Sequence, residues 1–385
     1  METHVVDLAA EYVRRGIETN AIVPSNTELD AVAARFVAKG VPAHRLDTDA
    51  RRGRSVQVQQ LWSTFRLITR LRPGVVHVQT GGATGGAAAV LLGRLAGARV
   101  VITEHDVPSV SPGLRQRTAR RVLDTACHAI IAVSRRNGAL RLERLGGPQD
   151  RFAAILNGVP VPEVESGLKA SNRIAIRGEY GIGAGTVVIG SVVRLAEGKG
   201  LNDLFEAFAR IKGDDRLRML LVGDGPLKTV LVDTAAGLGI DGQVIMAGHR
   251  DDPERFLDAM DLFVLPVPAG SMSIALLEAM ARGVAPMITF CGPEEAVIPD
   301  ISGYCAPPSD PEGLANALSA AVGDIEALRA MGELAARHAR RHFSVSRVAD
   351  DTLLVYSTRR GAFPERLRVN GRPNPYPGGL SGGAD

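Results

Sequence analysis

The chain has 385 residues, of which 45% are hydrophobic and 23% are charged. This composition is that of a globular protein with room for two domains, and it excludes a disordered chain. The net charge of +3 is mild and the arginines are spread along the sequence, so composition gives no reason to infer a nucleic-acid-binding protein.

The cysteines are few, widely spaced and flanked by apolar residues: Cys127, Cys291 and Cys305. We therefore expect free thiols in a reducing environment, not disulfides or a zinc site. The most apolar run, residues 87–102, is interrupted by Arg94 and Arg99 and is unsuited to spanning a bilayer, and no basic-then-apolar leader occurs. The sequence predicts a cytoplasmic protein with no transmembrane segment.

The chain begins within a predicted helix, because Val5, Leu8 and Tyr12 recur on one side. Short strands then alternate with helices. Strands are predicted at residues 19–23, 75–78, 100–103, 129–133 and 153–156, and helices at 28–39, 85–95 and 116–126. This alternation is typical of an α/β domain with a parallel sheet.

Polar residues end the strand predicted at 100–103. The run Thr103-Glu104-His105-Asp106 lies at its carboxyl end, which is the edge where open α/β sheets bind ligands. His105 is therefore a candidate site residue, although a lone histidine is more often structural.

A basic helix start follows, with four arginines: Arg115, Arg117, Arg120 and Arg121. A solvated helix face accounts for them most simply. A phosphorylated acceptor or an anionic membrane surface would also suit them.

A polar segment at residues 160–173 has little periodicity, and we expect the interdomain linker there. The next strand, 187–193, leads into a loop that holds Arg194, Gly198, Lys199 and Gly200 and then into an amphipathic helix. Fixed cations in such a loop can stabilise negative charge that develops as a bond breaks. Surface salt bridges are the alternative interpretation.

The stretch from Asp261 to Gly283 predicts a buried strand, a turn and an apolar helix. Ser271 or Ser273 can cap this helix, whose free N–H groups and dipole favour a phosphate. Glu278 is a carboxylate among apolar neighbours, and a ribose diol would satisfy both of its oxygens. An ordinary exposed helix glutamate is the alternative.

Residues 276–281, LLEAMA, together with the loop of Arg194 and Lys199, resemble the family-four glycosyltransferases. These have the GT-B architecture, in which two Rossmann-like doubly wound domains face each other across a cleft. In the family a strand precedes the first helix and lies near the centre of the N-terminal sheet. We therefore expect this first strand to be missing here.

The resemblance implies a role for each matching residue. Arg194 and Lys199 would neutralise the leaving diphosphate, Arg250 would lie beside the base, and Glu278 would hold the donor ribose. His105 would be the catalytic residue near the transferred sugar. The remaining donor-binding residues would be Ser271, Met272 and Ser273, and Gly270 stands where the family has a first glutamate.

The resemblance also implies the domain plan. Residues 1–160 would bind the acceptor and 161–345 the nucleotide-sugar donor, a helix at 346–360 would cross back to the first domain, and 361–385 would form a disordered tail. Asp47-Thr48-Asp49 fits a metal-binding Asp-x-Asp string, but it lies in the acceptor domain, so we expect neither a catalytic metal nor a cofactor.

The implied function is transfer of a sugar from a nucleoside diphosphate to an acceptor hydroxyl, with retention of configuration. The acceptor would be a small molecule or a glycan. Gly270 suggests a deoxygenated sugar, because a carboxylate there is useful only opposite a hydroxyl. Two alternatives stay open: a catalytically impaired nucleotide-sugar-binding partner subunit, and a sugar-nucleotide epimerase of the same fold.

Overall fold

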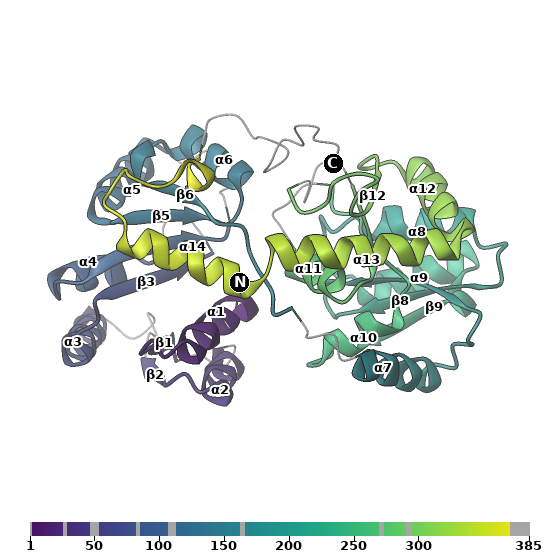
Figure 1. Cartoon of the computed structure of the whole chain (residues 1–385), viewed down its shortest axis with the longest axis horizontal. Coiled ribbons are helices and arrows are strands. Elements are labelled where there is room, and N and C mark those ends of the chain that lie inside the picture. Colours follow the sequence, from purple (N-terminus) through teal and green to yellow (C-terminus); the bar gives the residue numbers. More distant parts are fainter. Residues whose placement is uncertain are drawn as a thin grey trace, which may run out of the picture. The chain divides into compact units, whose positions relative to one another are not determined.

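The computed structural model describes residues 2–25, 29–46, 54–81, 85–106, 113–161, 166–268, 273–289 and 295–369. The chain divides into two compact units, one made of residues 1–158 and 345–385 and the other of residues 159–344. Both units are α/β, and every named strand pairs in parallel (Figure 1). None of the described helices is both long and apolar enough to cross a membrane.

The first unit alternates strands and helices. Its strands are β1 (Ala21–Pro24), β2 (Ala43–Leu46), β3 (Val75–Thr80), β4 (Arg99–Glu104), β5 (Ala129–Ala132) and β6 (Phe152–Ala154). Its helices are α1 (Glu2–Arg14), α2 (Asp30–Ala38), α3 (Arg54–Leu71), α4 (Ala87–Leu95), α5 (Leu114–Ala126), α6 (Arg135–Leu145) and α14 (Val345–Ser357), with the 3-10 turns η2 (Gln149–Arg151) and η4 (Glu365–Leu367).

The larger sheet of this unit is covered on both faces, which explains its continuously apolar strands. Because successive strand residues point to opposite faces, Val101 and Ile131 pack with α1 and α14, whereas Ile102 and Ile130 pack with α4 and α5. Both faces of this sheet are therefore buried in hydrophobic cores.

The strands of the first unit form two sheets, β1-β2 and β3-β4-β5-β6. Among the described residues, no ladder joins β1 to β3. In a doubly wound sheet the strand ahead of α1 would lie between these two, so the division falls where the sequence predicts a missing strand.

The second unit has one six-stranded sheet. Its strands are β7 (Val187–Val192), β8 (Leu217–Val222), β9 (Val244–Gly248), β10 (Leu262–Leu265), β11 (Ala285–Thr289) and β12 (Tyr304–Ala306). Its helices are α7 (Ser166–Glu179), α8 (Leu201–Arg210), α9 (Lys228–Leu238), α10 (Pro253–Ala259), α11 (Ile274–Ala281), α12 (Pro311–Gly323) and α13 (Ile325–His342), with the 3-10 turn η3 (Asp241–Gln243).

The strand order of this sheet is β12-β11-β10-β7-β8-β9. The chain moves outward from β7 through β8 to β9, and then returns to the other side of β7 with β10. Two neighbouring strands thus send their following loops in opposite directions. Ligands of open α/β sheets bind at this kind of switch point, outside the carboxyl ends of the strands.

Two expectations about connecting segments are wrong. Most of the expected linker at 160–173 lies in helix α7. This helix is held by polar contacts that could not be predicted from its composition: Asn172 donates to Asp258 (2.8 Å) and Arg173 pairs with Asp261 (2.6 Å). The expectation of a disordered tail from Gly361 onward is wrong for residues 361–369. Phe363 and Leu367 there are buried against the core of the first unit.

Glycines let the loops at the switch point lie against one another. Gly200, which precedes α8, has φ +66°, and a Cβ at that position would overlap the carbonyl oxygen of Pro266 after β10. A Cβ at Gly223 would likewise overlap the carbonyl oxygen of Val193. The loops after β7, β8 and β10 therefore meet backbone to backbone.

Replacing Gly200 by alanine should lower the free energy of unfolding by about 3 kcal/mol. The left-handed backbone accounts for about 1–2 kcal/mol, and overpacking against Pro266 adds about 1–3 kcal/mol. Gly198 is a matched control, because its φ is +74° but a Cβ added there would meet no atom within 4 Å. If urea unfolding showed the same loss of free energy of unfolding for both alanine variants, the close contact between Gly200 and Pro266 would be contradicted.

Candidate functional site

The loop after β7 presents two cations at the switch point. Arg194 is exposed and Lys199 is half-buried. Within the described part of the unit, neither side chain has a hydrogen bond or ion pair. Both charges are thus available to an anion at the carboxyl edge of the sheet, where β7 and β10 are neighbours.

Some other arginines of the second unit are paired with carboxylates. Arg282 binds Asp258 through Nε (2.8 Å) and Nη2 (2.5 Å), and Arg177 pairs with Asp261 (2.6 Å). Asp261 comes just before β10, at the opposite edge of the sheet. Arg194 and Lys199, at the carboxyl edge, have no such carboxylate partner among the described residues.

Backbone hydrogen bonds fix the rim around these cations. The N–H of Leu195 donates to the carbonyl of Asp224 (3.0 Å), and the N–H of Leu227 donates to that of Leu195 (3.0 Å). The N–H of Gly223 donates in turn to the carbonyl of Gly248, the last residue of β9 (2.8 Å). Because these loops support one another, a ligand here would meet a preorganised surface.

Helix α11 contributes the other half of the predicted site. Ser273 is its N-cap, and the Ser273 Oγ accepts from the N–H of Leu276 (3.4 Å). Glu278 is half-buried on this helix, among the buried Leu277 and Met280. Gly270, Ser271 and Met272 lie outside the described residues. The switch-point geometry thus brings the loop of Arg194 and Lys199 and the helix of Ser273 and Glu278 to adjacent strands.

Arg250 is held by its own unit. Its Nε donates to the carbonyl of Ala247 (3.0 Å), its Nη2 contacts the hydroxyl of Tyr180, and its guanidinium lies 5.1 Å from the ring centroid of Phe256. These contacts account for the side chain structurally. A role beside a base would require it to exchange partners.

His105 follows β4 in the first unit and is buried. Its Nε2 lies 2.8 Å from the Gln79 amide oxygen, so this nitrogen is the donor and Nδ1 is left as an acceptor. The Gln79 amide nitrogen lies 3.2 Å from Nε2 of His77, whose Nδ1 is 2.6 Å from the Tyr356 hydroxyl. The ring of His105 is thereby fixed through a chain of hydrogen bonds that sequence inspection did not find.

Both histidines of this chain of hydrogen bonds are neutral at ordinary pH. Burial, followed by the charge of His4, lowers the pKa of His105 to about 3 and that of His77 to about 3. His105 can therefore accept a hydrogen bond from a ligand at Nδ1, but it carries no imidazolium proton near pH 7.

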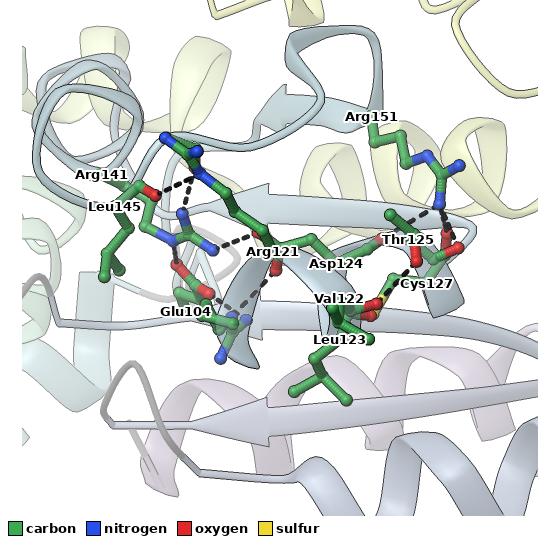
Figure 2. A network of polar contacts seen from close by, with 12 residues as sticks. Glu104, Arg121, Val122, Leu123, Asp124, Thr125, Cys127, Arg141, Leu145 and Arg151 are labelled. Carbon is green, nitrogen blue, oxygen red and sulfur yellow. Dashed lines mark hydrogen bonds and ion pairs between the residues drawn. The ribbon is translucent and has the colours of Figure 1, made fainter. Parts of the chain in front are cut away.

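A buried ion network surrounds Glu104, the residue that precedes His105 in the chain (Figure 2). Glu104 contacts Arg120 and also Arg141 (2.9 Å), while Asp124 contacts Arg120 (2.9 Å) and Arg141 (2.7 Å). All four side chains are at most 4% exposed. Arg120 is therefore not part of a solvated face, and the expectation for it is wrong. Each buried charge has two opposite partners, which offsets its desolvation.

Among the described residues, no three His, Cys, Asp or Glu side chains come together in a group able to hold a metal ion. Asp47, Thr48 and Asp49 lie outside them. Cys127 and Cys305 are free thiols.

Replacing His77 by asparagine should destabilise the protein less at about pH 5 than at about pH 7.5. The folded pKa of about 3 lies below the ordinary value of 6.5, so acid protonates the unfolded chain first. Below about pH 6.5, His77 therefore lowers the wild-type free energy of unfolding by about 1.4 kcal/mol for each pH unit of acidification. The variant has no such group and does not show this decrease. Urea unfolding at both pH values measures the difference.

The matched control is His249→Asn, because the His249 side chain is 75% exposed. This variant should follow the wild type at both pH values. If His77→Asn lowered the free energy of unfolding by the same amount at both pH values, His77 would not be held neutral in the folded protein.

Two family models match the chain. Residues 1–162 match Glycosyltransferase Family 4, and residues 186–324 match Glycosyl transferases group 1. Among curated proteins, the chain is 29% identical over 186 residues to N-acetyl-alpha-D-glucosaminyl L-malate synthase of Bacillus anthracis, covering 47% of this chain and 48% of that protein. It is 28% identical over 269 residues to D-inositol 3-phosphate glycosyltransferase of Nocardia farcinica, covering 66% and 57%. The matched segments thus span about half the length of these relatives.

Solved structures share the fold. Anabaena Alr3699/HepE in complex with UDP superposes with a TM-score of 0.77 at 19% identity, covering 92% of this chain and 95% of that one. A glycosyltransferase from Rickettsia africae ESF-5 gives 0.80 at 16% identity, covering 92% and 93%. With the two parallel-sheet units and the two family matches, these findings show that the chain belongs to the family-four and group-1 glycosyltransferases of GT-B fold.

Proposed function

We propose that this chain moves a sugar from a nucleoside-diphosphate donor to a hydroxyl of an acceptor. The observation that carries the proposal is the pair of uncompensated cations, Arg194 and Lys199, at the switch point of the second unit. A diphosphate is the leaving group that such cations favour, because they stabilise its charge as the glycosidic bond breaks.

The donor-binding residues of the proposal are those of the β7 and β10 connections, with Arg250 beside the base. The diphosphate would lie between the two cations and the N-terminus of α11, where Ser273 caps the helix. Glu278, one turn further along, would accept hydrogen bonds from the ribose. Anabaena Alr3699/HepE has also been solved in complex with UDP and glucose, which makes UDP the first nucleotide to test.

His105 enters the proposal as a neutral hydrogen-bonding group that faces the transferred sugar. Its Nε2 proton is committed to Gln79, and its pKa of about 3 excludes the imidazolium as a proton donor near neutrality. We assign no enzymatic nucleophile. The bond from the anomeric carbon to the diphosphate would break with electrostatic assistance, and the acceptor hydroxyl would attack on the same face and pass its proton to the departing diphosphate, which retains the anomeric configuration.

The sugar, the acceptor and the compartment complete the proposal. Gly270 in place of a glutamate suits a sugar that lacks one hydroxyl. Two relatives are named for L-malate and D-inositol 3-phosphate, so small hydroxyl-bearing anions belong among the test acceptors. The free thiols of Cys127 and Cys305 fit a reducing, cytoplasmic setting.

Transfer from a panel of UDP-, dTDP-, GDP- and ADP-sugars, deoxysugars included, tests the proposal. Arg194→Ala should lower kcat/KM roughly 100-fold or more, as loss of one fixed transition-state partner does in other enzymes. Glu278→Gln should raise the donor KM roughly tenfold, because a charge-assisted hydrogen bond becomes neutral. Arg216→Ala is the control, since Arg216 pairs with Asp214 ahead of β8, at the opposite edge.

Equal rates for Arg194→Ala and Arg216→Ala would contradict the proposed donor site. Two other results would favour the alternatives. Donor binding without any turnover would indicate a catalytically impaired partner subunit, and conversion of the donor sugar without acceptor would indicate an epimerase.

A further inference from the structure

Three side chains lead by hydrogen bonds to His105, and we call the four residues the polar chain. Tyr356 lies on α14, which packs on the main sheet of the first unit (Figure 1), while His77 and Gln79 lie on β3. The Tyr356 hydroxyl is 2.6 Å from Nδ1 of His77, and Nε2 of His77 is 3.2 Å from the Gln79 amide nitrogen. The Gln79 amide oxygen is 2.8 Å from Nε2 of His105. The polar chain thus ties helix α14 to the end of β4.

The donors and acceptors of the polar chain fix where its protons lie. An amide oxygen only accepts and an amide nitrogen only donates, so Gln79 requires a proton on Nε2 of His105 and none on Nε2 of His77. Both histidines are neutral near pH 7, and each neutral ring carries one N–H. His77 therefore holds its proton on Nδ1 and donates it to the Tyr356 hydroxyl. The two rings are held in opposite tautomers.

Gln79 sets the direction of the polar chain. The Thr103 hydroxyl also lies 2.7 Å from Nε2 of His77, and the Tyr12 hydroxyl lies 3.5 Å from that of Tyr356. Hydroxyl protons rotate to suit their partners and an imidazole can carry its proton on either nitrogen, whereas an amide presents its donor and its acceptor at different atoms. The orientation of the Gln79 amide therefore determines which nitrogen of each ring is protonated.

This arrangement decides what His105 can recognise. Its Nδ1 is an acceptor with no hydrogen-bond partner among the described residues. A hydroxyl can donate to this nitrogen, whereas an ionised phosphate or carboxylate has no proton to offer. We propose that Gln79 is a positioning residue, which keeps Nδ1 of His105 available as a hydrogen-bond acceptor for a substrate hydroxyl. The contact with substrate rests on the proposed transferase function, but the tautomers do not.

Nitrogen NMR of the labelled histidine rings reads the tautomers without any substrate. In the wild type, His105 should carry its proton on Nε2 and His77 on Nδ1. Gln79→Glu offers two acceptor oxygens at about pH 8, where a carboxyl is ionised. His77 should then move its proton to Nε2, so that both rings share one tautomer. Gln79→Leu offers no polar atom, and both rings should show mixed tautomers.

Two tyrosines of the same core provide a matched pair of variants. Tyr356→Phe removes the hydroxyl that accepts from His77. It should give mixed tautomers at His77 and also at His105, because the Gln79 amide is no longer held in one orientation. Tyr12→Phe is the control, since its hydroxyl is 3.5 Å from that of Tyr356 and lies outside the polar chain. It should keep the wild-type tautomers at both histidines.

The transfer assay gives the second readout. Gln79→Leu should lower kcat roughly tenfold or more with little change in the donor KM, because His105 is present but no longer held in one arrangement. Gln79→Glu keeps the proton of His105 on Nε2 and should retain more of the wild-type kcat than Gln79→Leu does.

Three results would overturn the positioning role. One is a wild type in which both rings share a tautomer or in which His105 carries its proton on Nδ1. Another is a pair of tautomers unchanged in both Gln79→Leu and Tyr356→Phe. The third is a wild-type kcat for Gln79→Leu. The expected tautomers without any sugar transfer by the wild type would instead contradict the proposed function, while supporting the hold of Gln79 on His105.

Discussion

The reversal of strand order between β7 and β10 is the constraint on which the chemistry of this protein depends. At the carboxyl edge of the second sheet it places side by side one connection that supplies Arg194 and Lys199 and another that supplies the capped helix α11. Elsewhere in the described part of this unit, arginines such as Arg177 and Arg282 are neutralised by buried or half-buried aspartates. Arg194 and Lys199 have no such partner within the described part of the unit, so their charge is available to a ligand.

The loops around Arg194 and Lys199 are packed tightly against one another. The loops after β7, β8 and β10 touch through backbone atoms at Gly200 and Gly223, so side chains are excluded from the contact. In the first unit, polar side chains at the end of β4 are fixed by a buried ion network of Glu104, Arg120, Asp124 and Arg141. Beside it, Gln79 orients the His105 ring. Both arrangements hold polar groups in place before any ligand arrives, which lowers the reorganisation needed on binding.

Much of this could be predicted from the sequence. The apolar run 187–193 and the loop after it identify β7 and its cations, and LLEAMA identifies α11. The alternation of strands and helices gives the parallel sheets. These signals are local, because each motif is contiguous in the chain.

Other features depend on contacts between distant segments. Helix α3 was not predicted, although its apolar residues recur at three- and four-residue spacing along one face that includes the buried Ile68. Arg120 looked like a surface cation, but its partners Glu104 and Asp124 become apparent only when β4 and α5 are brought together. The link from Gln79 to His105 joins β3 to the end of β4 and has no sequence signature. Residues 361–369 look like a tail by composition, yet Phe363 fills a core position.

Hydrogen–deuterium exchange of the full chain, with and without UDP, tests the diphosphate site at the switch point. We expect UDP to slow amide exchange in residues 193–200 and 273–281, the two connections at the switch point, and uridine without phosphates to do so far less. Slower exchange only at the amino edge of the sheet, or equal protection by uridine and UDP, would contradict a diphosphate site built from Arg194, Lys199 and the N-terminus of α11.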